Sequence, residues 1–226
     1  MRTPYPILLT STFFNNRSVL VVGGGQVAER RIKSLLDSGA SIQLIAPEIT
    51  KDLEQLVNRS SLKWHKQSWQ SGTLHKYPDA LVVLAATNRT DVNREIAQEA
   101  KAAGRLVNLA DDPAGSDFIL PAVLHSGEIT ITISTFSESA TPVLSAHLRE
   151  KLAQIIGPEY GRLSALLKEL RPYVKATVEP TLRPLLWRQM VGSSALDLLK
   201  ENKEAEARSL LEAIFLEFTG RTSNGA

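Results

Sequence analysis

Residues 17–31, RSVLVVGGGQVAERR, decide the fold. Val19 to Val22 form a β-branched and aliphatic run, which is typical of a buried strand in a parallel sheet. Gly23, Gly25 and Ala28 then supply the spacing G-x-G-x-x-A. The first glycine permits a tight turn, the second lets a diphosphate approach the backbone, and the third small residue lets a helix pack on the strand. Such a helix directs its free N–H groups toward the diphosphate. Glycine turns between strand and helix are common. Here the buried strand that directly precedes the turn favours a dinucleotide site over a plain structural turn.

The composition is that of an ordinary globular protein. The chain has 226 residues, of which 43% are hydrophobic and 22% charged, with a net charge of +2. It has no dense cluster of Lys and Arg, so we expect no nucleic acid partner. The absence of cysteine excludes disulfides, thiolate zinc sites and cysteine nucleophiles.

The sequence also lacks the usual signals for export or membrane insertion. The apolar run in residues 1–17 is too short and interrupted for a signal peptide. No stretch approaches the roughly 20 apolar residues of a membrane span. We therefore expect a cytoplasmic protein without a membrane partner.

Strand and helix signals alternate through the first half of the chain. Beyond the first strand, the pattern predicts strands at 41–46, 62–65, 80–85 and 105–109, and helices at 27–36, 49–58 and 91–103. Alternation on this scale predicts an α/β fold with a Rossmann-like parallel sheet and helices on both faces.

The pattern changes after residue 113. Residues 118–124 and 128–134 flank a Ser126-Gly127 turn and predict an antiparallel hairpin. In its second strand isoleucines occupy one face and threonines the other, and the threonine face is either solvated or covered by another sheet or subunit. Helices are predicted at 143–156, 159–176, 184–191 and 194–218. The expected parts are a Rossmann domain at 1–113, a small β module at 114–142, a helical domain at 143–218 and a disordered tail at 219–226.

Candidate cofactor residues follow the predicted strands at their carboxyl ends, where open α/β sheets bind ligands. Glu48 lies about 20 residues past the glycines, where an acidic residue can bind a ribose 2′-hydroxyl, although a charge at a helix N-terminus explains it equally well. No arginine directly follows this strand to hold a 2′-phosphate, which favours NAD over NADP. Ala86 and Thr87 suit a backbone that passes close to a cofactor, while Thr87 or Asn88 also suits a helix N-cap.

Candidates for acid–base chemistry are fewer. Asp111 and Asp112 follow the fifth strand and include a possible general base, but by pattern alone such residues more often form turns. The four histidines lack the spacing of metal ligands, so no preformed metal site is expected. His147 is the one histidine near a candidate site, just after a loop rich in Ser and Thr.

Several segments together resemble one family. VLVVGGGQVAERR, IAPE, VVLAATN, VNLADDP, DFILPAVL and PVLSAHLREKL occur in the order found in precorrin-2 dehydrogenases of the sirohaem-synthase type. The resemblance implies NAD-dependent oxidation of the tetrapyrrole precorrin-2 to sirohydrochlorin and, in some members, insertion of Fe²⁺. Co²⁺ is the other metal to consider. It also implies a homodimer that associates through the β module and the carboxyl-terminal part.

The resemblance assigns roles to particular residues. Asp111 is implied as the proton acceptor in dehydrogenation and as important to chelation. For the removal of pyrrole protons during metal insertion, His147 is our second choice after Asp111. The implied and predicted cofactor site comprises Gly23, Gly24, Gly25, Gln26, Val27, Ala28, Pro47, Glu48, Ala86 and Thr87.

One loop departs from the family pattern. The family reads S-[ST]-G-G-x-S-P before its helix, whereas residues 134–142 read STFSESATP, two residues longer and without the glycine pair. This loop should border the tetrapyrrole. Ser134 and Thr135, with the basic Arg149 and Lys151, are the expected contacts to the substrate.

Two other functions remain open on the sequence. Another NAD-linked dehydrogenase of small molecules would require a compact apolar pocket. A regulator that senses NAD without catalysis would usually carry a DNA-binding or channel-binding module, and no basic recognition helix is evident.

Overall fold

The computed structural model describes residues 14–59, 61–135 and 142–223. The chain forms two compact units, Met1–Leu120 and Pro121–Ala226, which are considered separately below. Most of the amino-terminal run, residues 136–141 of the departing loop, and residues 224–226 of the predicted tail lie outside the described residues.

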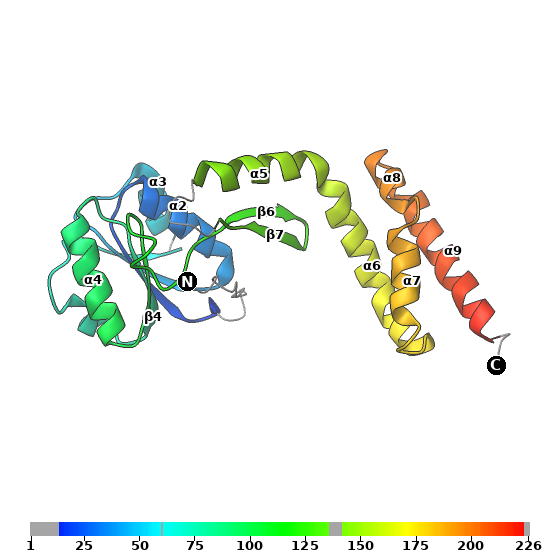
Figure 1. Ribbon diagram of the computed structural model, residues 1–226, viewed down its shortest axis with the longest axis horizontal. Coiled ribbons are helices and arrows are strands. Elements are labelled where there is room, and N and C mark those ends of the chain that lie inside the picture. The colour runs from blue at the N-terminus through cyan, green and yellow to red at the C-terminus, as the bar shows by residue number, and fades with distance from the viewer. Residues whose placement is uncertain (1–13, 60, 136–141, 224–226) are drawn as a thin grey trace. The chain divides into compact units, whose positions relative to one another are not determined.

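The first unit is built on a five-stranded parallel sheet in the order β3-β2-β1-β4-β5. The strands are β1 (Ser18–Val22), β2 (Ser41–Ile45), β3 (Lys63–His65), β4 (Ala80–Ala85) and β5 (Leu106–Leu109). Helices α2 (Gln26–Leu35) and α3 (Lys51–Asn58) cover one face, and α4 (Thr90–Ala102) covers the other (Figure 1). The predicted Rossmann-like sheet is confirmed.

The central strand explains why its sequence is apolar throughout. Val19 and Val21 pack with α2 and α3 on one side of the sheet, while Leu20 and Val22 pack with α4 on the other. All four are at most 1% exposed. A strand buried on both faces needs a continuous apolar run rather than an alternating one.

Side chains cover the outer edge of β5. The Val107 N–H donates to Asp117 Oδ2 (2.9 Å), the Asp117 N–H donates back to Val107 O (2.8 Å), and the Leu109 N–H donates to Ser116 Oγ (2.9 Å). These bonds satisfy an edge that would otherwise be open to pairing. They attach residues 116–118 to the sheet, so the first unit continues past the predicted boundary at 113 to Leu120.

The second unit combines a hairpin with helices. Strands β6 (Ala122–Ser126) and β7 (Ile129–Ile133) pair antiparallel, as predicted. The isoleucines of β7 are half-buried and its threonines exposed, so either interpretation of the threonine face still stands. Helices α5 (Pro142–Ile155) and α6 (Pro158–Thr177) both contact the hairpin.

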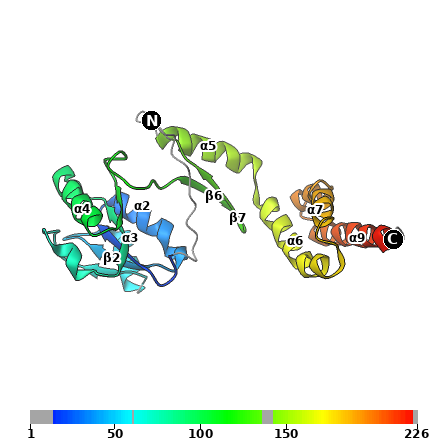
Figure 2. The ribbon, with the colours of Figure 1, turned by 60° about the horizontal axis from the view of Figure 1, so that its bottom comes forward.

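A helical core follows the hairpin. It is formed by α6, α7 (Arg183–Val191), α8 (Ala195–Lys200) and α9 (Glu204–Ser223), and Figure 2 shows α6, α7 and α9 gathered around it. The leucines of α6 face this core, with Leu163 and Leu166 buried and Leu167 and Leu170 partly buried. Within the described ranges, no helix combines the length and apolar character needed to cross a membrane.

Two local predictions were wrong, and one short element was not predicted. The helix expected at 194–218 is two helices, because the chain turns at Asn202, whose φ of 61° lies in the left-handed region that Asn tolerates. Helix α9 continues to Ser223, so residues 219–223 are helical rather than a disordered tail. The connection from β3 to β4 contains a short 3₁₀ helix, η2 (Thr73–Lys76), whose Leu74 anchors it in the core.

Candidate functional site

The three glycines after β1 occupy three different environments. A Cβ on Gly23, whose φ is +115°, would lie 2.3 Å from Ala86 O, and a Cβ on Gly24 would lie 1.9 Å from Glu48 O. A Cβ on Gly25 would have no atom within 4 Å. Gly23 and Gly24 therefore let the turn pack against the loops after β4 and β2, while Gly25 leaves the helix start open.

Helix α2 begins at this open turn. Gly25 is its N-cap, and the Glu29 N–H donates to Gly25 O (3.0 Å). The N–H groups of Gln26, Val27 and Ala28 precede that bond and have no acceptor within the helix. Gln26 and Val27 are exposed, whereas Ala28 is fully buried against the sheet. The turn thus offers backbone donors and free space together, which fits the diphosphate of a dinucleotide.

The loop after β2 is joined to this turn. The Thr50 N–H donates to Gly24 O (3.1 Å), and Thr50 Oγ1 donates to Glu29 Oε2 (2.7 Å). Lys33 pairs with both Glu29 and Asp52 at 2.6 Å, which connects the two helices further. The sequence did not predict these links, which hold the starts of α2 and α3 together.

Pro47 and Glu48 are exposed between β2 and α3. Helix α3 begins only at Lys51, with Thr50 as N-cap accepting from the Leu53 N–H (3.3 Å). The acidic residues of its first turn are Asp52 and Glu54. Glu48 thus lies two residues before the N-cap, outside the first turn of the helix, and its expected contact with a ribose remains a prediction.

The loop after β4 is organised by a buried amide that the sequence did not reveal. Asn93 of α4 is 0% exposed. Its Oδ1 accepts from the Thr87 N–H (3.1 Å) and from Thr87 Oγ1 (2.7 Å), and its Nδ2 donates to Thr87 O (3.2 Å) and to Asp111 Oδ1 (3.0 Å). The N-cap of α4 is Arg89, so neither Thr87 nor Asn88 has that role.

Asp111 is exposed after β5, and its carboxylate is held from α4. Partial burial alone would raise the pKa of Asp111. Hydrogen bonds from Thr90, from its own backbone and from Asn93, with the charge of Arg94, outweigh this effect and place the pKa below its ordinary value. The group is therefore ionised at neutral pH and accessible, as a proton acceptor must be.

Asp112 has a different role from its neighbour. Its Oδ1 accepts from the Gly115 N–H (2.9 Å), and its carbonyl accepts from Ser116 Oγ (2.9 Å). Asp112 thus closes the turn, and the sequence alone left this division of roles open.

Arg31 of α2 lies beneath the carboxyl ends of β4 and β5. Its guanidinium donates to Ala85 O (3.4 Å), Asn108 O (3.5 Å) and Leu109 O (3.3 Å). Burial and the neighbouring Arg30 lower the pKa of Arg31 to about 10, against the opposing effect of Asp111. Arg31 stays charged at neutral pH and holds the strand ends that carry the site. No pattern in the sequence singled it out.

The remaining predicted residues lie in the second unit. His147, Arg149 and Lys151 are exposed on α5, where Arg149 pairs with Glu150 at 3.7 Å. Ser134 and Thr135 are half-buried after β7, with Thr135 Oγ1 3.3 Å from Ser145 Oγ. The structure thus gathers the predicted cofactor residues and Asp111 at one edge of the first unit, and places the predicted substrate contacts and His147 in the second.

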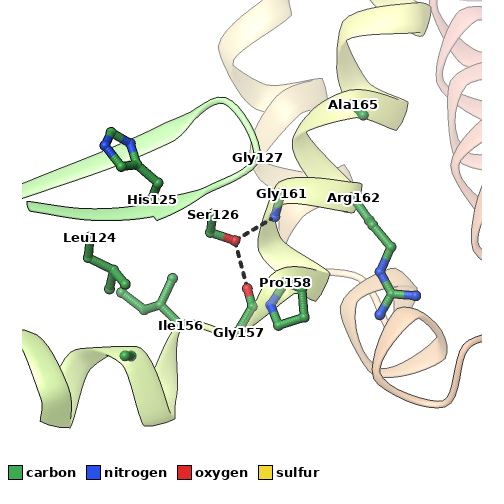
Figure 3. Close-up of a pocket in the computed structure, with 11 residues that line it drawn as sticks. Leu124, His125, Ser126, Gly127, Ile156, Gly157, Pro158, Gly161, Arg162 and Ala165 are labelled. Carbon is green, nitrogen blue, oxygen red and sulfur yellow. Dashed lines mark hydrogen bonds between the residues drawn. The ribbon is translucent and has the colours of Figure 1, made fainter. Parts of the chain in front are cut away.

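A hollow of about 530 Å³ lies where the hairpin meets the α5–α6 junction (Figure 3). Ser126 Oγ bridges the two parts, donating to Gly157 O (2.7 Å) and accepting from the Gly161 N–H (3.1 Å). The walls of the hollow are mainly apolar, and His125 and Arg162 are the titratable residues that line it. None of the predicted site residues lines it. Among the described residues, no group of three His, Cys, Asp or Glu is placed to hold a metal ion.

A parallel sheet with an open glycine turn at its carboxyl edge defines a dinucleotide-binding protein. Residues 12–122 match a family described as "Putative NAD(P)-binding", and residues 159–215 match the sirohaem synthase dimerisation region. With both regions present, the chain belongs to the sirohaem-synthase-type family. The resemblance found in the sequence is confirmed.

Individual relatives agree with this assignment. The chain is 34% identical to siroheme synthase 3 of Aeromonas hydrophila subsp. hydrophila over 203 residues, and 33% identical to siroheme synthase 1 of Aeromonas salmonicida over 208 residues. These alignments cover 89% and 91% of this chain but 42% and 43% of the relatives, so the chain spans about two fifths of their length. A solved structure, "SirC, precorrin-2 dehydrogenase", superposes with a TM-score of 0.74 at 26% identity, covering 93% of this chain and 100% of that one.

Proposed function

We propose that this chain catalyses the NAD-dependent dehydrogenation of precorrin-2 to sirohydrochlorin. The observation that carries the proposal is the arrangement at the carboxyl edge of the sheet. An open glycine turn follows β1, an exposed ionised carboxylate follows β5, and these strands are separated only by β4. The similarity to SirC, a precorrin-2 dehydrogenase matched over its whole length, supports this substrate.

The residues of the first unit would hold the cofactor as follows. Backbone N–H groups of Gln26 to Ala28 would bind the diphosphate above Gly25, and Glu48 would bind a ribose hydroxyl. Ala86 and Thr87 would line the path toward the nicotinamide. When bound, NAD⁺ supplies the acceptor for a hydride.

Dehydrogenation removes one hydride and one proton from the macrocycle. We assign the proton to Asp111, because its carboxylate is ionised, exposed and fixed in orientation by Asn93. A positioned base of this kind contributes roughly 10²–10⁴-fold to the rate. In the second unit, Arg149, Lys151, Ser134 and Thr135 are the proposed contacts to the carboxylates of the tetrapyrrole.

Metal insertion would be a separate activity of the same residues. Fe²⁺ or Co²⁺ would enter as a substrate and displace pyrrole protons, which we assign first to Asp111 and second to His147. Sirohydrochlorin mixed with either metal ion and no NAD⁺ tests this step, through a metal-dependent spectral change above the uncatalysed rate.

The proposed assembly is a homodimer. The match to the sirohaem synthase dimerisation region supports it. Helix α5 adds a second support, because it leaves Val143, Leu144 and Ile155 exposed by 70%, 51% and 66%. A subunit contact would remove these apolar side chains from water.

The test combines binding with turnover. Calorimetry should detect binding of NAD⁺ and weaker binding of NADP⁺. In a separate turnover assay, addition of enzymatically generated precorrin-2 should produce NADH. Asp111→Asn should lower turnover by roughly 10²–10⁴-fold while NAD⁺ affinity stays near wild type and thermal melting shows a folded protein. Turnover within twofold of wild type would remove Asp111 from the mechanism. NAD⁺ binding without any precorrin-2 oxidation would favour another dehydrogenase or a sensor.

A further inference from the structure

We propose that Asn93 is a positioning residue that orients the Asp111 carboxylate for proton transfer and joins it to the cofactor loop at Thr87. The inference rests on the proposed function, because it concerns how the assigned base is held. The observation behind it is one side-chain amide, fully buried, that contacts both loops.

Asn93 occupies a position that packing alone would give to an apolar residue. Helix α4 buries Asn93, Ile96, Ala97 and Ala100, which is one continuous face at helical spacing. Three of the four are aliphatic. Removing an amide from water is costly unless it is fully hydrogen-bonded, so a buried Asn at the end of this face needs partners that repay the loss.

Those partners are complete and they fix the orientation of the amide. The Thr87 N–H can only donate, so the atom facing it must be Oδ1, and the atom facing Asp111 must be Nδ2. Both Nδ2 hydrogens and both Oδ1 acceptor positions are then used. Asp111 Oδ1 consequently always accepts a hydrogen bond from Asn93 Nδ2, while the residue itself remains exposed to a substrate.

The two sides of the amide therefore have separable roles. Oδ1 bonds only Thr87, whereas Nδ2 donates to Asp111 (3.0 Å) and, at 3.2 Å, also to Thr87 O. Thr90, three residues earlier on α4, also bonds the Asp111 carboxylate, and Arg94 and Arg31 are the cations that act on it. A change confined to Nδ2 should remove the bond to the carboxylate, while the two bonds from Thr87 to Oδ1 still hold the cofactor loop after the bond to Thr87 O is lost.

Asn93→Asp is such a change, since it keeps an oxygen for Thr87 and replaces the donor facing Asp111 with a second carboxyl oxygen. Two adjacent carboxyls share a proton, so the pair should titrate at least about one pH unit above wild-type Asp111. In the cofactor-free protein, this is measured from the ¹³Cγ signal of Asp111, assigned by its loss in Asp111→Asn. Turnover should fall at least about tenfold with a matching shift of the acid limb of its pH profile, while the Kd for NAD⁺ stays within about threefold.

A second variant and a control complete the test. Asn93→Leu is similar in size and removes both donor and acceptor, so it should raise the Asp111 midpoint and also weaken NAD⁺ binding. Should Asn93→Asp fail to fold, Asn93→Leu alone tests the positioning role. Ile96→Val, on the same buried face, should keep the wild-type midpoint, affinity and turnover.

The possible results separate the two claims. An Asp111 midpoint and turnover equal to wild type in a folded Asn93 variant would overturn the positioning role and reduce Asn93 to packing. A wild-type protein that binds NAD⁺ but does not oxidise precorrin-2 would instead overturn the proposed function, whatever the midpoint does.

Discussion

Two loops at the same edge of the sheet are held in opposite ways. After β1, the position of the turn is set by backbone packing, since Gly23 and Gly24 touch the loops after β4 and β2 with no space for a side chain. After β5, the position of Asp111 is set by side-chain hydrogen bonds from α4 and by the turn that Asp112 closes. The first loop should therefore not tolerate an added atom at Gly23 or Gly24, whereas the second should keep its fold and lose its chemistry when a polar atom is exchanged.

The largest effect is expected from Gly24→Ala. The new Cβ would lie 1.9 Å from Glu48 O and 2.9 Å from the Ala46 Cβ, so the backbone of one loop must move. We expect the free energy of unfolding to fall by about 3 kcal/mol, as for a strongly overpacked site. Chemical denaturation of the purified variant measures this. A loss of less than about 1 kcal/mol would show that the packing of this turn is adaptable.

The sequence predicted the first of these loops and not the second, for a physical reason. A buried strand, a glycine spacing and a helix start are local signals, and residues 17–31 contain all three. The bonds of Asn93 join residues 6 and 18 positions away, which no local pattern encodes. The available signal was one polar residue on the otherwise apolar face that continues through Ile96, Ala97 and Ala100.

The same distinction explains the other outcomes. Strand positions were predicted to within one or two residues in the first unit, most clearly for β1 and β4, where burial on both faces leaves a continuous apolar run. The turn at Asn202 and the 3₁₀ helix at Thr73–Lys76 were missed, because tertiary packing, rather than propensity, decides such short elements. The contacts of Arg31 with three backbone carbonyls were invisible for the same reason.

A smaller effect, on binding rather than folding, is expected from Gly25→Ala. Its Cβ would meet no atom within 4 Å, and its backbone is extended with φ −84° and ψ −175°. Stability should change by less than about 1 kcal/mol, the range for a weaker residue at an N-cap. The methyl group would occupy the space proposed for the diphosphate, so the Kd for NAD⁺ should rise about tenfold, or about 1.4 kcal/mol.

Paired with Gly24→Ala, this variant separates two uses of adjacent glycines. Denaturation and calorimetry on both proteins should give opposite rankings, with Gly24→Ala less stable and Gly25→Ala folded but weaker in binding. Unchanged NAD⁺ affinity in Gly25→Ala would show that the diphosphate does not lie at this turn.

The smallest effect is a difference in acid stability between the two loops. Because the pKa of Asp111 is lower in the folded chain than its ordinary value, its ionised form stabilises the fold above about pH 4. That contribution is lost as the pH falls through the folded pKa. The stability deficit of Asp111→Asn should thus be constant above about pH 5 and shrink below about pH 4. The deficit of Gly24→Ala, being steric, should stay constant over the same range.

Denaturant midpoints measured in parallel from neutral to acid pH test this difference. Asp52, Asp91 and Glu169 also have lowered pKa values, but they are present in every variant and cancel in the comparison. A deficit of Asp111→Asn that does not change below pH 4 would mean that its hydrogen bonds do not favour the ionised form. The bond from Asn93 would then contribute nothing to the ionised form of Asp111, so this measurement on the cofactor-free protein bears on the base and on its positioning residue together.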